Sequence, residues 1–349
     1  MNAELLEELN DIAVRMVAPG KGILAADEST GTIKKRFDSI GLDSTEDNRR
    51  DYRELLFRTE DAMQNHISGV ILFDETIRQK AEDGTPLVKL IEAAGSIPGI
   101  KVDKGAQDLA GYPGEKVTEG LDGLRARLEE YHELGARFAK WRAVIDIARG
   151  GSMAMPSYGC LKANMHALAR YAALCQEQRI VPIVEPEVLM DGDHDIDRCF
   201  EVTEQGLRLL YEELFDAGVA LEGTILKPNM VIAGKKADRQ ADTDEIAEKT
   251  VACFRNSVPA AVPGIVFLSG GQSEVQATEN LSAMNRDFAD QMPWKLSYSY
   301  GRALQASTLE AWGGKRDNVA AAQAAFNHRA KMNGHAQLGT WSSEMEGAA

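Results

Sequence analysis

The chain has 349 residues, of which 44% are hydrophobic and 27% are charged, so it is long enough to bury a full core. Its formal net charge of −15 argues against nucleic acid or an anionic membrane as a partner, but it leaves a small anionic ligand open. The cysteines share no short spacing typical of a metal site or a redox pair, and the acidic N-terminus lacks the pattern of a signal or transit peptide. We therefore expect a soluble, cytoplasmic protein.

Short apolar runs alternate with helical segments along the chain. The predicted strands lie within 22–30, 69–74, 98–103, 137–142, 180–187, 224–226, 264–269 and 294–299. Helical periodicity is found at 5–17, 121–134, 162–177, 201–215 and 244–256.

Eight strands separated by helices predict an α/β fold, a single (β/α)8 TIM barrel with an N-terminal helix. A doubly wound open sheet is the alternative. That fold would need a glycine-rich loop after its first strand, whereas Gly20-Lys21-Gly22 precedes one. We expect residues 1–330 to form the barrel domain. The polar, small residues of 331–349 are expected to form a flexible tail.

A lysine stands at the carboxyl end of the sixth predicted strand. Residues 224–226 are apolar or β-branched, Lys227 follows them, and Pro228 ends the strand because it has no N–H to donate. A buried ammonium is costly to desolvate, but a lysine amine can attack a carbonyl group and form a Schiff base. The alternative is a lysine that simply reaches solvent from the strand end.

Other charged residues occupy the same relative position on their strands. Lys101 and Asp103, Lys140 and Arg142, and Glu185 and Glu187 are i,i+2 pairs, and Asp27 follows the first strand. Side chains two residues apart share one face of a strand, and the carboxyl ends of barrel strands form the active-site end. The pattern predicts that these charges converge with Lys227.

Two groups of residues have the composition of phosphate sites, in which glycine N–H groups, hydroxyls and an arginine bind the anion. The first group follows the last two strands and contains Ser269, Gly270, Gly271, Ser299, Gly301 and Arg302. The second group follows the first and third strands and contains Ser29, Thr32, Lys35, Arg36 and Lys101.

A metal site is not expected. Residues 191–195 resemble the start of a calcium loop, but Ile196 and Val202 replace the required glycine and glutamate, so we interpret this stretch as a polar loop and helix cap. The histidines are scattered along the chain with no paired spacing at a strand end.

Eight motifs together resemble the class I fructose-bisphosphate aldolase family. They lie at 24–30, 69–73, 100–105, 138–142, 181–187, 226–230, 268–273 and 299–305. The resemblance covers about residues 20 to 315 in the order of the family. It implies reversible cleavage of fructose 1,6-bisphosphate to dihydroxyacetone phosphate and glyceraldehyde 3-phosphate, without a cofactor, by a homotetramer whose partners are sugar phosphates.

The resemblance also implies a role for each residue. Lys227 would form the Schiff base, Glu185 would dehydrate the carbinolamine with Glu187 beside it, and Asp27 and Lys140 would handle the hydroxyl whose deprotonation cleaves the carbon–carbon bond. The first phosphate group would hold the phosphate next to the ketone. The second group, together with Arg142, would surround the far phosphate.

Three features depart from the family, one of which is the loop at 150–161, which does not follow the pattern expected from animal members. Thr32 takes a place that serine often holds. Well-studied members end in a tyrosine on a mobile tail, whereas the last tyrosine of this chain is Tyr300.

Overall fold

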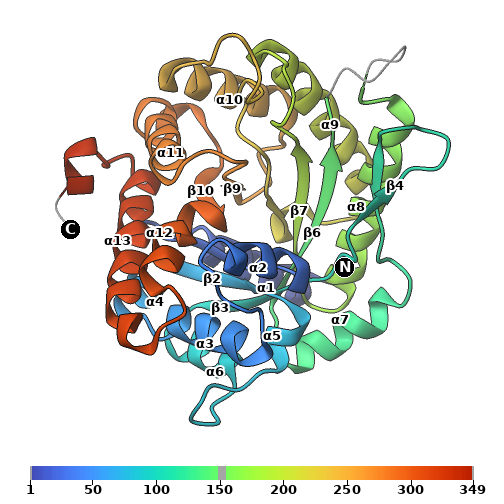
Figure 1. Cartoon of the computed structure of the whole chain (residues 1–349). Helices are drawn as coiled ribbons and strands as arrows, with labels where there is room; N and C mark the ends of the chain where they lie inside the picture. The colour runs from blue at the N-terminus through green and yellow to red at the C-terminus, as the bar shows by residue number, and fades with distance from the viewer. Residues whose placement is uncertain (1, 148–154, 348–349) are drawn as a thin grey trace.

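A closed barrel of eight parallel strands forms the centre of the protein, and the computed structural model describes residues 2–147 and 155–347 (Figure 1). Around the barrel the strands follow the order β1-β10-β9-β8-β7-β6-β3-β2. Their bounds are β1 Gly22–Ala26, β2 Ile67–Leu72, β3 Ile97–Lys101, β6 Phe138–Ile145, β7 Val181–Val188, β8 Ile225–Leu226, β9 Gly264–Phe267 and β10 Lys295–Tyr300. Each predicted strand region overlaps one of them, so the (β/α)8 prediction is confirmed.

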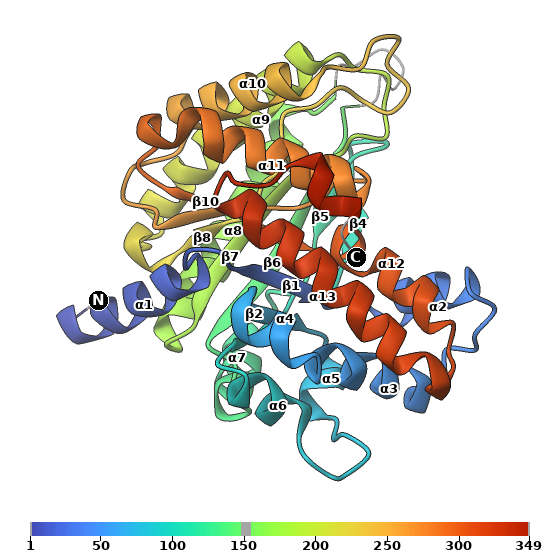
Figure 2. The ribbon, with the colours of Figure 1, turned by 90° about the vertical axis from the view of Figure 1, so that its left-hand side faces the viewer.

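Helices surround this barrel, and most of them cover its outer face (Figures 1 and 2). They are α1 Ala3–Met16, α2 Thr30–Asp38, α3 Glu46–Phe57, α4 Glu60–Asn65, α5 Asp74–Arg78, α6 Leu87–Ala93, α7 Leu124–Glu133, α8 Tyr158–Glu177, α9 Ile196–Asp216, α10 Thr243–Ser257, α11 Glu274–Phe288, α12 Arg302–Trp312 and α13 Val319–Gln337. The strands are buried on both faces, which explains why they read as nearly continuous apolar runs.

Small and large residues alternate inside the barrel so that its interior is filled. A Cβ on Gly99 would lie 2.2 Å from the ring of Phe138, and a Cβ on Gly69 would lie 2.9 Å from it, so these glycines make room for the ring. Helix α1 packs Ile12 and Met16 into the same apolar cluster. It lies at the end of the barrel opposite α2, which follows β1 (Figure 2). The strands therefore end, at their carboxyl termini, on the side of the barrel where α2 lies and away from α1.

A small antiparallel sheet was not foreseen from the sequence. It pairs β4 (Ala106–Asp108) with β5 (Lys116–Thr118) beside the barrel. Three residues per strand are too few for an alternation to be recognised.

The C-terminal helix α13 extends past the expected domain end at residue 330. Residues 331–337 continue the helix and are mostly buried. Many of its buried residues are small or polar, among them Ala330, Asn333 and Gly334. A Cβ on Gly334 would lie 2.7 Å from the carbonyl oxygen of Gly20, so the close packing depends on small residues. This composition hides the apolar periodicity by which a helix is recognised.

The last described residues dock onto α13 through Glu346, which lies in the short 3-10 helix η4 (Ser343–Gly347). Arg329, whose side chain is 4% exposed, donates to the Glu346 carboxylate through both Nη atoms, with Nη2 3.0 Å from Oε1. Trp341 Nε1 donates to the same oxygen at 2.9 Å. Figure 1 places η4 at the outer edge of the ring, away from the barrel centre.

We expect Glu346→Gln to lower the free energy of unfolding by about 1.5–3 kcal/mol, because it removes a charged partner from a buried arginine. Burial raises the pKa of Glu346, but Arg329 outweighs it and holds that pKa below its usual range. The stabilisation that the Glu346–Arg329 ion pair gives the folded state is therefore present above the unfolded-state pKa of Glu346, and it is lost as the pH falls through the folded-state pKa. Urea unfolding at several pH values, with the exposed Glu344→Gln as control, measures it. Equal effects of the two variants would contradict this docking.

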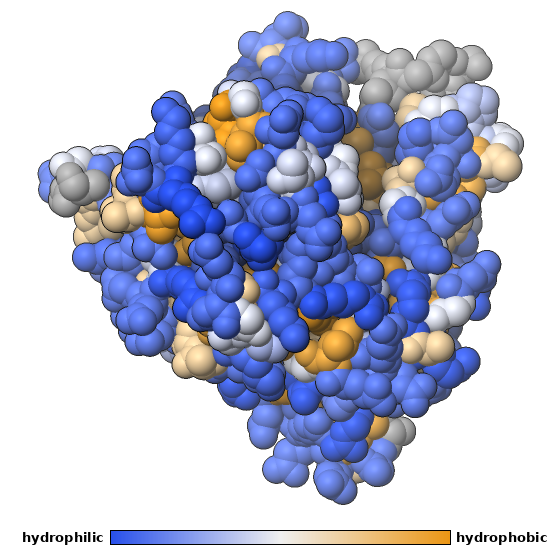
Figure 3. Space-filling view, turned by 60° about the horizontal axis from the view of Figure 1, so that its bottom comes forward, coloured by the Kyte–Doolittle hydropathy of each residue, from blue (hydrophilic) through white to orange (hydrophobic). Residues whose placement is uncertain are grey.

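The surface is largely hydrophilic on the face seen in Figure 3, where hydrophobic side chains form small separate areas. None of the helices in the described parts of the chain is long and apolar enough to cross a membrane.

Candidate active site

The strands bring seven charged side chains to their carboxyl ends, which face the viewer in Figure 1. Parallel register sets Lys101 of β3 opposite Lys140 of β6, and Arg142 of β6 opposite Glu185 of β7. The full set is Asp27, Lys101, Lys140, Arg142, Glu185, Glu187 and Lys227. The predicted convergence is therefore present, since members of this set contact one another directly.

Four of these residues form a continuous chain of ion pairs. Lys227 Nζ lies 3.1 Å from Glu185 Oε1, and Lys140 Nζ lies 3.2 Å from Glu185 Oε2 and 2.8 Å from Asp27 Oδ2. The side chains of Lys227, Lys140 and Glu185 are only 4–5% exposed. Lys227 therefore does not reach out to solvent, which was the alternative reading of a strand-end lysine.

The four ion-paired residues balance one another in charge, because two lysines face two carboxylates. Burial raises the pKa values of Asp27 and Glu185, but Lys140 and Lys227 outweigh it and hold both pKa values below the usual range. Burial lowers the pKa of Lys140, whereas Asp27 and Glu185 raise it, and the net shift is upward. Lys140 is consequently a fixed cation between two ionised carboxylates at neutral pH.

The other predicted charges pair separately. Arg142 forms an ion pair with Glu187, and Lys101 Nζ lies 2.9 Å from Asp103 Oδ1. Asp103 also accepts from the backbone N–H groups of Gly105, at 3.2 Å, and Arg142, at 3.4 Å. Glu187 thus lies beside Glu185 in β7, as predicted, but its ion-pair partner is an arginine.

The turns after β9 and β10 have the features expected of an anion site. Gly270 and Gly271 have φ angles of +52° and +81°, which favour glycine. The Ser299 hydroxyl is buried and has no hydrogen-bond partner among the described residues. Gly301 precedes α12 without a side-chain cap, so the first N–H groups of this helix are open to an anion. Arg302 is exposed at the first position of that helix.

The residues expected at the far phosphate lie on or near α2. The Ser29 and Thr32 hydroxyls are 3.1 Å apart, and Lys35 is exposed one turn later. Arg36 extends toward the β10 turn, since its Nη2 lies 3.3 Å from the position of a Cβ on Gly301. Arg36 therefore stands next to both expected phosphate groups. Ser29 and Lys101 also line a hollow of about 570 Å³ that opens beside α5 and α7.

A buried acid that the sequence reading did not single out holds Arg36 in this position. Glu28 accepts from Arg36 through Oε1 and from the buried Arg53 through Oε2, at 2.8 Å for the latter. Gln305 Nε2 donates to Glu28 Oε1 at 3.1 Å. The sequence does contain a sign of this role. Glu28 directly follows Asp27 at the end of an apolar strand, and a charge buried there needs a charged partner.

The loop that resembles a calcium site caps a helix. Asp195 Oδ1 accepts from the backbone N–H of Arg198 at 2.8 Å, so it is the N-cap of α9. Within residues 2–147 and 155–347, no three His, Cys, Asp or Glu side chains are grouped so that they could hold a metal ion.

The geometry defines a class: a TIM-barrel protein that carries a buried lysine, paired with a carboxylate, at the active-site end of its strands. A family model for fructose-bisphosphate aldolase class-I matches residues 8–349. A probable fructose-bisphosphate aldolase class 1 of Xanthomonas campestris is 59% identical over 337 residues, which are 96% of this chain and 99% of that protein. Fructose-bisphosphate aldolase C of Rattus norvegicus is 52% identical, with 100% and 95% covered.

A solved structure agrees with these sequences. Fructose-bisphosphate aldolase from Plasmodium falciparum, in complex with TRAP and a small-molecule inhibitor, superposes with a TM-score of 0.94 at 48% identity and covers 98% of this chain and 97% of that one. The chain belongs to the class I fructose-bisphosphate aldolase family. It is a lyase that cleaves fructose 1,6-bisphosphate, and class I is the metal-independent type of this enzyme.

Proposed function

We propose that Lys227 is the amine that attacks the ketone carbon of fructose 1,6-bisphosphate. The chain of ion pairs from Lys227 through Glu185 and Lys140 to Asp27 carries this proposal. Nitrogen adds to the carbonyl carbon to give a carbinolamine, and loss of water then gives the iminium ion, the protonated Schiff base. The iminium group accepts the electron pair of the carbon–carbon bond that breaks, so that the aldehyde half leaves and the ketone half stays on Lys227 as an enamine. Protonation of the enamine carbon and hydrolysis of the resulting iminium then release dihydroxyacetone phosphate and the free amine.

Glu185 is the proton carrier of the carbinolamine step. Its Oε1 lies 3.1 Å from Lys227 Nζ, within reach of the nitrogen and of the hydroxyl that must depart as water. In this role it takes a proton from the Lys227 nitrogen, which leaves the neutral amine free to attack, and later gives a proton to the hydroxyl that departs as water. Glu187 contributes from the same strand, held by Arg142.

Asp27 and Lys140 act at the hydroxyl next to the bond that breaks. An ionised carboxylate can accept the hydroxyl proton, and the ammonium 2.8 Å away stabilises the negative charge that develops on the oxygen. The burial of Lys140 strengthens this interaction, because water does not screen it.

The two phosphates bind on either side of this centre. The near phosphate is assigned to the turns after β9 and β10, supported by the unpartnered Ser299 hydroxyl and the open start of α12. The far phosphate is assigned to the cations and hydroxyls on one rim, namely Ser29, Thr32, Lys35, Arg36, Lys101 and Arg142. Arg36 stands close enough to Gly301 to serve both.

The proposal extends to assembly and location. The resemblance to the family supports a homotetramer, and size-exclusion chromatography with light scattering tests it. A cytoplasmic location is supported by a relative in Arabidopsis thaliana, 54% identical, that is named a cytosolic aldolase.

We expect fructose 1,6-bisphosphate to be cleaved at an undiminished rate after exhaustive dialysis against EDTA, since the proposed electron sink is the iminium ion. An assay that couples dihydroxyacetone phosphate to NADH oxidation measures the rate. Activity that is lost on dialysis and restored by zinc would contradict the proposed chemistry. Cleavage of a ketose monophosphate but not of the bisphosphate would contradict the two-phosphate assignment.

A further inference from the structure

The loops that follow β7, β8 and β9 meet at one lysine outside the residues discussed so far. The backbone N–H of Lys235, in the loop after β8, donates to the carbonyl of Met190 at 2.8 Å. The next N–H, that of Lys236, donates to the carbonyl of Gly192 at 3.0 Å. These two bonds fix the loop after β8 against the loop after β7.

The side chain of Lys235 then extends over the turn after β9. Its Nζ lies 2.8 Å from the position that a Cβ on Gly271 would occupy, and Met190 Sδ lies 3.0 Å from the same position. Any side chain at residue 271 would displace the ammonium. Gly271 therefore serves two purposes, because it adopts a φ of +81° and leaves room for a cation.

The present partner of this cation is weakly held. Lys235 Nζ lies 3.0 Å from Asp191 Oδ1, and the two side chains are 45% and 68% exposed. An exposed ion pair contributes little, about 0–1 kcal/mol. An anion at the β9 turn can therefore attract the ammonium away from Asp191 at little cost.

We propose that Lys235 is a further phosphate-binding residue, which exchanges Asp191 for the phosphate next to the ketone. This inference rests on the proposed function, in which Ser269, Gly270 and Ser299 hold that phosphate. Lys235 adds a mobile positive charge on the β8 side of the site, while Arg302 stands on the β10 side. Its charge strengthens the binding of ketoses that carry a phosphate at the carbon beside the carbonyl.

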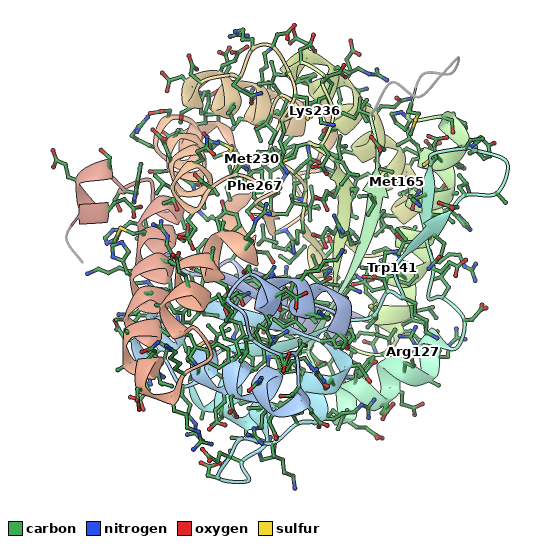
Figure 4. The ribbon with its side chains drawn as sticks, in the orientation of Figure 1. Arg127, Trp141, Met165, Met230, Lys236 and Phe267 are labelled. Carbon is green, nitrogen blue, oxygen red and sulfur yellow. The ribbon has the colours of Figure 1, made fainter. Side chains whose placement is uncertain are left out.

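The test compares Lys235→Met with Lys236→Met, a matched control. Lys236 is also exposed, and Figure 4 shows it farther from the centre of the molecule than Met230 and Phe267. We expect Lys235→Met to raise KM for fructose 1,6-bisphosphate, and the inhibition constant of dihydroxyacetone phosphate, by roughly three- to tenfold at low ionic strength. Lys236→Met leaves both within twofold of the wild type, and Lys235→Arg restores most of the loss.

Asp191→Asn separates phosphate binding from a purely structural tie between loops. If Lys235 exchanges partners, removal of the competing carboxylate lowers KM; if the ion pair only fastens the loops, Asp191→Asn raises KM as Lys235→Met does. The inference is overturned by that second result, or by equal KM values for Lys235→Met and Lys236→Met. A wild-type protein that does not cleave the bisphosphate would instead count against the proposed function.

Discussion

Lys227→Met is expected to abolish cleavage of fructose 1,6-bisphosphate, because no other amine can replace the covalent step. The methionine replaces the apolar part of the lysine side chain and omits only its terminal amine, so the fold is expected to persist. Borohydride added with dihydroxyacetone phosphate should reduce the Schiff base of the wild-type protein to a stable adduct on Lys227. The measurements are the coupled assay and mass spectrometry of the labelled peptide.

Two further variants control for charge and for non-specific labelling. Lys227→Arg retains a cation beside Glu185 but not the nucleophilic amine, so it should be inactive as well. Lys236→Met removes an exposed lysine from the same part of the chain and should keep both cleavage and labelling. A label that maps to Lys140, or substantial cleavage by Lys227→Met, would assign the nucleophile elsewhere.

The strand pattern explains how much of the site could be predicted from the sequence. A period of two along each strand places Lys140 with Arg142 and Glu185 with Glu187, and the barrel brings all carboxyl ends to one side. These rules are local, or follow from the fold class alone. These rules alone place the charged set at the carboxyl end of the barrel.

The pairing within that set could not be predicted in the same way. Asp27 follows β1 and Lys140 lies in β6, and these strands are not neighbours in the sheet, so their ion pair crosses the barrel interior. Whether Glu187 pairs with a lysine or with Arg142 depends on side-chain directions that no spacing rule fixes. The approach of Lys235 to Gly271 likewise depends on two loops that meet only in the folded barrel.

Lys140→Met is expected to lower kcat by about 10²–10⁴-fold, the range for loss of a group that takes part in general acid–base catalysis. The variant leaves two buried carboxylates, Asp27 and Glu185, and of the two lysines that pair with them only Lys227 remains. Lys101→Met is the comparison, since Lys101 stands opposite Lys140 in the ladder but pairs with Asp103. If Lys101 binds the far phosphate, its loss raises KM more than it lowers kcat.

The pH profile distinguishes a role of Lys140 in the chemistry from a role in packing alone. Lys140 holds the pKa values of Asp27 and Glu185 below their usual range, so its removal lets both pKa values rise. The carboxylates then become protonated at higher pH, and the acid limb of the kcat/KM profile moves upward. A defect in packing would lower the rate without moving that limb. A variant whose kcat stays within tenfold of the wild type, with an unchanged acid limb, would remove Lys140 from the catalytic centre.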